Sequence, residues 1–158
     1  MRFVRPDSIY TAEDFAYSPF LVFYEVTRAC DLACAHCRAC AQPMLHPKEL
    51  NNEQSRALLS QLASFPKKPT LVFTGGDPMK RPDICDLVQY AVSEGLVVAM
   101  TPSATPLLTP QAVSDLKAAG VSRMAMSLDA ADAETHDAFR GVSGSFQRTV
   151  ETMKAARD

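Results

Sequence analysis

The sequence has little net charge and no long hydrophobic run, and both absences narrow the possible functions. Its 16 Lys and Arg residues and 18 Asp and Glu residues give a formal net charge of −2 at pH 7. A protein that binds nucleic acid presents a strongly basic surface, so this balance argues against a nucleic-acid partner. The longest apolar stretches, such as 20–26 and 96–100, are far shorter than the roughly 20 residues that a membrane span requires.

The chain also has few cysteines, and their odd number argues against a disulfide framework. There are five, and no secretory leader is evident, so we expect a cytoplasmic protein whose thiols stay reduced. Three of them, Cys30, Cys34 and Cys37, are spaced C-x3-C-x2-C. Clustered thiolates select iron–sulfur clusters, zinc or cuprous copper. Because a four-iron cluster normally takes four cysteines, a set of three leaves one iron free to bind a small molecule.

Zinc is the main alternative for this cysteine loop. Three thiolates with His36 or Cys40 as a fourth ligand would satisfy tetrahedral coordination. Zinc sites usually pair their ligands in two separated C-x2-C knuckles, however, and the sequence lacks a second pair. The spacing therefore favours an iron–sulfur cluster. Cys40 is expected to be either a thiol close to the cluster or a merely packed one, rather than a ligand. Cys85 is expected to be a small buried side chain without a chemical role.

Strand-like apolar runs alternate with helical periods, which predicts an α/β fold with a parallel sheet and right-handed crossovers. We expect an N-terminal arm over residues 1–19 and one core domain over 20–158. Strands are predicted at 20–26, 70–74, 96–100 and 122–128, the first of them buried. Helices are predicted at 51–66, 82–95 and 109–120, with a short one after Asp132 and a last one from Ser145 that buries Phe146, Val150 and Met153.

Polar motifs follow the predicted strands. Gly75-Gly76-Asp77-Pro78 follow the second strand, residues 101–105 follow the third, and Ser127-Leu128-Asp129-Ala130 close the fourth. Ligands of parallel α/β sheets bind at the carboxyl ends of the strands. Since the cysteine loop follows the first strand, we expect all four segments to line one binding site at this edge of the sheet.

These three motifs, in this order, resemble the radical SAM superfamily. The cysteine loop is similar to its cluster-binding motif, Gly75-Gly76-Asp77-Pro78 to its GGEP motif, and Ser127-Leu128-Asp129 to its S-x-D-G strand end. The resemblance implies a partial TIM-type barrel, of which this chain supplies a parallel (βα)4 portion. It also implies that Cys30, Cys34 and Cys37 hold a [4Fe-4S] cluster whose fourth iron is chelated by S-adenosylmethionine.

The same resemblance implies which residues contact that cofactor. His36 contacts the adenine, Ser103 faces the ribose, and Ser127 donates its hydroxyl to the carboxylate. The backbone of Gly75 and Gly76 approaches the amino group of S-adenosylmethionine. Glycine permits this close approach because it has no Cβ.

Further positions belong to the resemblance, and two of them, Asp77 and Ala130, depart from the family pattern. Asp77, followed by Pro78, replaces the more usual Glu and either holds the loop or reaches the amino group. Asp129 matches the acid of the S-x-D-G pattern, whereas Ala130 replaces its glycine. Arg140 either anchors a carboxylate with its guanidinium fork or forms a surface ion pair.

The resemblance also implies a reaction. A reductant such as ferredoxin or flavodoxin supplies one electron, S-adenosylmethionine is cleaved to methionine and a 5'-deoxyadenosyl radical, and the radical abstracts hydrogen from a tetrapyrrole or peptide substrate. Because the cofactors carry this chemistry, no catalytic acid, base or nucleophile is assigned. His46 and His136 are expected to lie on loop surfaces.

Radical SAM enzymes are usually built on six strand–helix units, and this sequence supplies four. We therefore expect a missing C-terminal half or a partner chain that completes the barrel, since an open sheet edge is a liability. Two other functions stay open at this point. One is a catalytically incompetent iron–sulfur binding module or subunit, and the other is a zinc-stabilised structural domain.

Overall fold

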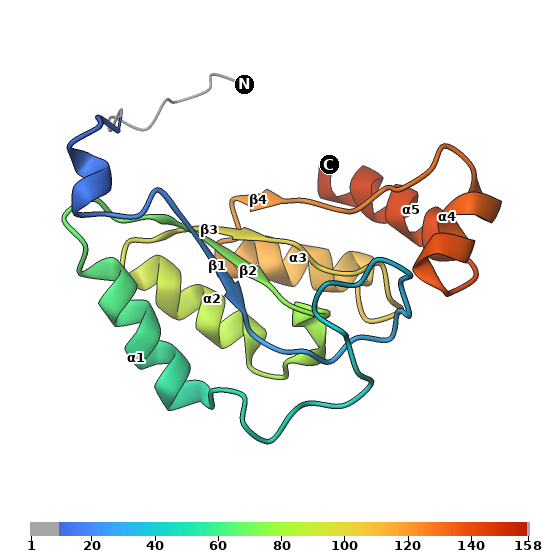
Figure 1. Ribbon diagram of the computed structural model, residues 1–158, viewed down its shortest axis with the longest axis horizontal. Helices are drawn as coiled ribbons and strands as arrows, with labels where there is room; N and C mark the ends of the chain where they lie inside the picture. Colours follow the sequence, from blue (N-terminus) through green and yellow to red (C-terminus); the bar gives the residue numbers. More distant parts are fainter. Residues whose placement is uncertain (1–9, 158) are drawn as a thin grey trace.

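The computed structural model describes residues 10–157, which contain a sheet of four parallel strands in the order β1-β2-β3-β4. The strands are β1 (Leu21–Glu25), β2 (Thr70–Thr74), β3 (Val97–Met100) and β4 (Arg123–Met124). Each strand joins the next through a helix, so that neighbours in sequence are neighbours in the sheet (Figure 1). The expected parallel α/β fold is confirmed.

The helices of the described residues are α1 (Asn52–Ala63), α2 (Ile84–Ser93), α3 (Pro110–Ala119), α4 (Ala133–Arg140) and α5 (Ser145–Arg157). Several begin where the sequence predicts. Asn51 and Gln54 form a reciprocal capping box on α1, Thr109 caps α3, and Asp132 caps α4. Each cap side chain accepts a hydrogen bond from a backbone N–H group that has no partner within the first turn of the helix. No helix within residues 10–157 is long and apolar enough to cross a membrane.

The hydrophobic core lies between one face of the sheet and helices α1, α2 and α3 (Figure 1). Alternate strand residues point into it, including Leu71 and Phe73 of β2 and Val98 and Met100 of β3. Burying each such side chain contributes roughly 1.5–3 kcal/mol. The core therefore fixes the strands whose carboxyl ends carry the polar motifs.

The opposite face of the sheet carries exposed apolar side chains on β1 and at the start of β3, although Val72 at its centre is buried. Leu21 and Phe23 of β1 are 38% and 63% exposed, and Val97 of β3 is 51% exposed. The expectation of a buried first strand is therefore wrong for this face. Because side chains alternate along a strand, Val22, Tyr24 and the following Val26 face the core, and Val22 is only partly buried there.

The fourth strand is much shorter than the predicted 122–128. Only Arg123 and Met124 pair with β3, and residues 125–130 continue without regular structure. The partner strand itself ends at Met100, so it offers no further ladder to this segment. Ser127 and Asp129 consequently lie beyond the sheet rather than at the end of a strand.

Two helix boundaries also differ from the prediction. Helix α1 ends at Ala63, which leaves Phe65 outside it, and α2 begins at Ile84 rather than Pro82. The later start of α2 has a physical reason. The side chains of Arg81 and Asp83 pair with each other across the turn before the helix.

Helix α5 buries a different face from the one predicted. Met153 is 41% exposed, and Phe146 and Val150 are only partly buried. The buried face carries small polar residues instead: Ser145, Thr149 and Thr152. Asp137 of α4 fixes this orientation, because its carboxylate accepts hydrogen bonds from the backbone N–H of Phe146 at 2.8 Å and from the Ser145 hydroxyl at 2.9 Å.

Candidate functional site

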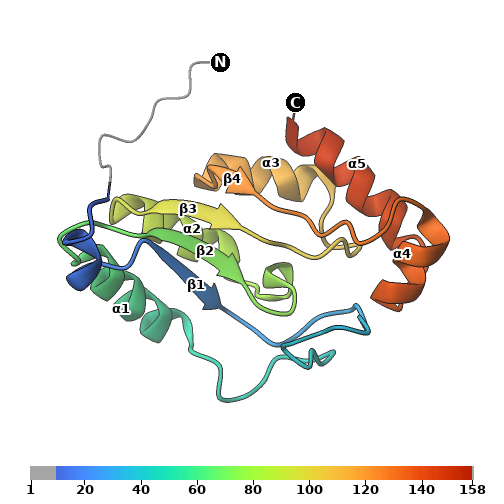
Figure 2. The same ribbon diagram turned by 45° about the horizontal axis from the view of Figure 1, so that its top comes forward.

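A cavity of about 270 Å³ lies at the carboxyl ends of the strands. In Figure 2 the strand arrows point toward the loops and α4, where this cavity is found. Most of the residues singled out from the sequence line it: Cys30, Cys34, His36, Cys37, Gly75, Gly76, Ser103 and Ser127. Asp77, Pro78 and Asp129 are not among its lining residues.

Each of the three clustered thiols accepts a hydrogen bond. The backbone N–H of Leu32 donates to Cys30 Sγ at 3.4 Å, and that of Ala41 donates to Cys37 Sγ at 3.4 Å. Cys34 Sγ accepts a hydrogen bond from the guanidinium Nη1 of Arg140 at 3.5 Å. Burial raises the pKa of the Cys30 thiol. Cysteine binds metals as the thiolate, and each sulfur has a donor beside it that a metal-bound thiolate can keep.

The thiols do not converge on a point that one metal ion could occupy. Within residues 10–157, no group of three His, Cys, Asp or Glu side chains is arranged to hold a single ion. A tetrahedral zinc site needs four ligands within about 2.0–2.3 Å of one centre. Within the described residues, the side chains therefore form no ready-made tetrahedral zinc site.

Gly75 and Gly76 let the loop after β2 pack directly against the start of the cysteine loop. A Cβ on Gly75 would lie 2.3 Å from the Thr27 carbonyl oxygen, and one on Gly76 would lie 2.5 Å from the Ala29 carbonyl oxygen. Gly75 also has a φ of +141°, which favours glycine. The structure thus gives these glycines a second reason to be there, beside close approach to a cofactor.

Asp77 holds the two neighbouring loops together. Its side chain is fully buried and accepts hydrogen bonds from the backbone N–H of Met79 at 3.1 Å and of Ser103 at 3.3 Å, and from the Thr105 hydroxyl at 2.7 Å. Burial raises the pKa of this carboxyl group. Of its two expected roles, the geometry supports loop holding.

Ser103 connects the cysteine loop to the loop after β2. Its hydroxyl donates to the Gly76 carbonyl oxygen at 3.0 Å and lies 3.6 Å from Cys30 Sγ. One hydroxyl therefore touches both a proposed metal ligand and the glycine loop.

The cysteine loop also docks on the last turn of α4. The His36 ring stacks on Phe139 with centroids 4.4 Å apart. The backbone N–H groups of Ala33 and Ala35 donate to the carbonyl oxygens of Arg140 and Phe139, at 3.1 Å and 2.9 Å. Phe139 was missed in the sequence analysis, because nothing in its spacing points to a loop 100 residues earlier.

His136 is buried rather than on a loop surface, so that expectation is wrong. It lies on α4, is 1% exposed, lines the cavity, and its Nδ1 accepts the backbone N–H of Asp129 at 3.2 Å. Asp129 in turn pairs with Arg140, Oδ2 to Nε, at 2.5 Å. The Arg140 side chain is only 12% exposed, and its Nη2 is buried without a hydrogen-bond partner among residues 10–157.

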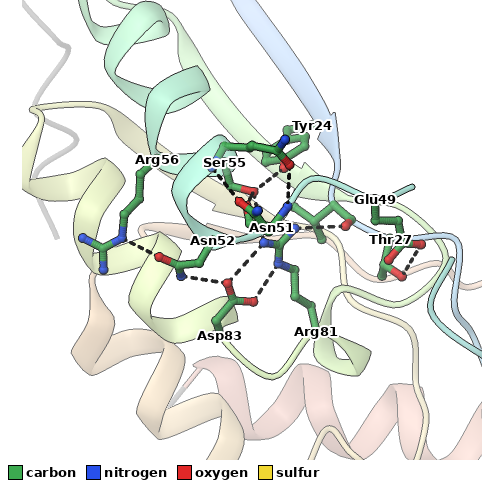
Figure 3. A network of polar contacts seen from close by, with 11 residues as sticks. Tyr24, Thr27, Glu49, Asn51, Asn52, Ser55, Arg56, Arg81 and Asp83 are labelled. Atoms are coloured by element: carbon green, nitrogen blue, oxygen red, sulfur yellow. Dashed lines mark hydrogen bonds and ion pairs between the residues drawn. The ribbon is translucent and has the colours of Figure 1, made fainter. Parts of the chain in front are cut away.

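A second polar network anchors the strand that leads into the cysteine loop (Figure 3). Arg81 pairs with Asp83 at 2.7 Å and donates to the Ser55 hydroxyl at 3.0 Å and to the Val26 carbonyl oxygen at 3.3 Å. Tyr24 also bonds to Ser55, at 2.8 Å. The network ties the end of β1 to the starts of α1 and α2.

The comparison with protein families identifies this combination of motifs and fold. The family model described as the radical SAM superfamily matches residues 24–158. This chain belongs to the radical SAM superfamily. The matched range contains the cysteine loop and both of the motifs that resemble the family pattern. Membership implies a [4Fe-4S] cluster and S-adenosylmethionine as the superfamily's cofactors.

Two curated relatives of this radical SAM chain are similar in sequence. AdoMet-dependent heme synthase of Nitratidesulfovibrio vulgaris is 43% identical over 150 residues, which cover 94% of this chain and 40% of that protein. Mycofactocin maturase MftC of Mycobacterium tuberculosis is 32% identical over 137 residues, which cover 87% of this chain and 34% of that protein. The chain thus spans less than half the length of either relative.

The radical SAM fold itself is matched by solved structures. Streptococcus suis SuiB bound to S-adenosylmethionine aligns with a TM-score of 0.69 at 19% identity, covering 87% of this chain and 31% of that chain. SuiB bound to its precursor peptide SuiA gives a TM-score of 0.71 at 19% identity, with 87% and 30% covered. The expected (βα)4 portion of a radical SAM barrel is confirmed as the fold.

Proposed function

We propose that this chain is the core of a radical SAM enzyme, in which Cys30, Cys34 and Cys37 hold a [4Fe-4S] cluster and S-adenosylmethionine binds the remaining iron. The observation that carries the proposal is that three thiols of one loop share a cavity with Gly76 and Ser103 from the next two loops. When bound and reduced by one electron, these cofactors supply a 5'-deoxyadenosyl radical that abstracts hydrogen from a substrate. The protein supplies placement and a shielded site.

The protein groups around the thiols suit a set of thiolate ligands. Two backbone N–H groups and one guanidinium group donate to the three sulfurs. Hydrogen bonds to sulfur and burial are the means by which proteins tune iron–sulfur clusters. The chain's own contribution is to hold these three sulfurs in place with hydrogen bonds that a bound cluster would also experience.

His36, Gly75, Gly76, Ser103 and Ser127 are proposed to surround S-adenosylmethionine. One face of the His36 ring is covered by Phe139, which leaves its edge and backbone for the adenine. The Ser103 hydroxyl donates to Gly76, so its lone pairs can accept a hydrogen bond from a ribose hydroxyl.

Asp77, Pro78 and Asp129 are proposed to position these groups from behind the cavity wall. Asp77 joins the loops after β2 and β3, and Pro78 follows it at the first position of a 3-10 turn, Pro78–Lys80. Asp129 holds Arg140 against the cysteine loop. We expect substitutions there to weaken cofactor binding through loop displacement.

A tetrapyrrole or a peptide is the proposed substrate class. The relatives' names support both, one being a heme synthase and the other a maturase of mycofactocin. A one-electron donor such as ferredoxin or flavodoxin, and a cytoplasmic location, complete the proposal. All of these refer to whole enzymes more than twice the length of this chain.

A second candidate is a cluster-binding module that requires a partner chain or a C-terminal half for turnover. The exposed apolar face at Leu21, Phe23 and Val97 favours it, because large apolar side chains gathered on one face commonly mark a contact surface. Strand β4, with two residues and a neighbour on one side only, adds a free sheet edge.

The test is anaerobic reconstitution with iron and sulfide, dithionite reduction, and assay of 5'-deoxyadenosine formed from S-adenosylmethionine. The control pair is Cys34→Ala, which removes a proposed ligand, and Cys85→Ala, which removes a thiol packed on the core side of α2. The proposal expects cleavage that is lost only in Cys34→Ala.

Other results separate the candidates. A cluster without cleavage favours the module that needs a partner. Zinc in place of iron and sulfide favours a structural domain, and a chain that binds no iron contradicts the proposal.

A further inference from the structure

The Arg140 guanidinium links a carboxylate to one of the proposed cluster ligands. Its Nε lies 2.5 Å from Asp129 Oδ2, and its Nη1 donates to Cys34 Sγ at 3.5 Å. Among the described donors to the three thiols it is the charged one, since the other two are the backbone N–H groups of Leu32 and Ala41.

We infer that Arg140 is a positioning residue that raises the reduction potential of the cluster through Cys34, and that Asp129 limits this effect. The inference rests on the proposed function, because it requires a cluster on the three cysteines. It assigns to Arg140 a role toward the protein's own sulfur, whether or not the side chain also contacts a ligand.

Electrostatics gives the sign of the effect. Reduction adds one electron from the external donor to the cluster and neither forms nor breaks a bond, so the reduced state carries one more negative charge. A neighbouring cation stabilises that state, and a neighbouring anion opposes it. Because the Arg140 side chain is 12% exposed and that of Asp129 is 22% exposed, water and salt screen both charges less than they screen a surface pair.

The backbone holds the guanidinium at this distance. The carbonyl oxygens of Phe139 and Arg140 accept the N–H groups of Ala35 and Ala33, so the last turn of α4 and the cysteine loop move together. The next residue, Gly141, has a φ of +71°, and a Cβ there would lie 2.5 Å from the Ala33 carbonyl oxygen. The close contact between α4 and the loop therefore depends on a glycine.

The experiment measures the midpoint potential of the reconstituted full chain by anaerobic EPR-monitored potentiometry without S-adenosylmethionine. Arg140→Met removes the cation, Arg140→Lys keeps it, and Asp129→Asn removes the anion while retaining an oxygen that accepts from Arg140. Arg38→Met is the matched control. It removes an equal charge beside Cys37, from a side chain that is 80% exposed.

Shifts of opposite sign are the expected result. Arg140→Met disfavours reduction about tenfold, which lowers the potential by about 59 mV for one electron, and Asp129→Asn raises it. Arg140→Lys and Arg38→Met stay close to the wild type. If the pair had a purely structural role, the midpoint potential would shift in the same direction in Arg140→Met and in Asp129→Asn.

Three results would overturn the inference. The first is an unchanged potential in Arg140→Met or, if that variant does not fold, in Asp129→Asn. The second is a shift of the same sign in Arg140→Met and Asp129→Asn. The third is a shift in Arg38→Met as large as the shift in Arg140→Met. A wild-type chain that binds no cluster overturns the proposed function and this inference with it, whereas a loaded cluster with an unchanged potential overturns the inference alone.

Discussion

Substituting Gly76 by alanine is the sharpest test of how the cysteine loop is held. The added Cβ would lie 2.5 Å from the Ala29 carbonyl oxygen, 2.7 Å from the Arg28 carbonyl oxygen and 2.8 Å from the Ala29 carbonyl carbon. All three are backbone atoms, which no rotamer change can remove. The loop after β2 must therefore separate from the cysteine loop.

The expected loss of stability follows from the hydrogen bonds that this separation breaks. The N–H of Gly76 donates to Thr27 at 2.8 Å, and that of Asp77 donates to Ala29 at 2.7 Å. Leaving a buried donor unpaired costs about 1–3 kcal/mol, so the two together predict a loss of roughly 4 kcal/mol. The φ of Gly76 is not in the left-handed region, so backbone strain contributes little.

Gly95→Ala is the matched control. Gly95 has a φ of +79°, but the nearest atom to its added Cβ is the Nζ at the flexible tip of Lys68. The cost is therefore the left-handed conformation, about 1–2 kcal/mol.

Urea unfolding of the apo chain gives both free energies by linear extrapolation, and iron bound per chain after reconstitution gives a second readout. We expect Gly76→Ala to lose more stability and to bind less iron than Gly95→Ala. Equal losses in the two variants would refute the steric argument.

Three further predictions concern other parts of the site. Arg81→Met removes the cation that pairs with Asp83 and leaves that carboxylate only the Asn52 amide as a side-chain donor, which should cost about 3 kcal/mol in urea unfolding. The hydrogen bond from Arg81 lowers the pKa of Asp83 from its ordinary value of 3.8, so this stabilisation is present above pH 3.8 and is lost as the pH falls further. The difference in stability between the variant and the wild type should therefore shrink in acid. A difference that does not change with pH would contradict this. Cys40→Ser should retain the iron of the wild type, whereas loss of iron would make Cys40 a ligand. Burial raises the pKa of Asp77, so the free energy of unfolding should fall as the pH rises above the ordinary pKa of an aspartate and this carboxyl group must ionise in the folded protein. Asp77→Asn should make that fall with pH less steep. A slope equal to that of the wild type would count against the prediction.

The sequence predicted the elements whose signals are local. The cap at Asn51 and Gln54, the Thr109 cap of α3 and the glycine after it are all present, because each depends on contacts within a few residues. The strands at 70–74 and 97–100 were also found, since their apolar runs are flanked by clear breaks.

The errors concern what packs on each element. The apolar run of β1 has no signal for its exposed face, so Phe23 was expected to be buried and is 63% exposed. The face of α5 was misjudged because Asp137 on another helix orients it. His136 was expected at the surface because a lone histidine carries no sequence signal for burial, which here results from contacts with Phe146 and Asp129.

The site itself was predicted as a set of segments but not as a set of contacts. The three thiols, the glycine pair and Ser103 meet at one cavity because parallel strands bring their carboxyl ends to one edge. What the sequence did not reveal is that the cysteine loop is held from two sides. On one side the glycines admit the loop after β2; on the other, α4 supplies Phe139 and Arg140.

This two-sided support implies that α4 belongs to the site. A cysteine loop fixed only by β1 and β2 would have Cys34 and His36 at its free outer end. The backbone bonds from Ala33 and Ala35 to the end of α4 close that end, and they do so through residues that follow the fourth strand. Since the contact is with the last turn of α4, a chain ending before Gly141 should lose order in the cysteine loop while its sheet and core remain intact. Hydrogen exchange at Ala33 and Ala35 would measure this, and protection unchanged by such a truncation would show that β1 and β2 hold the loop alone.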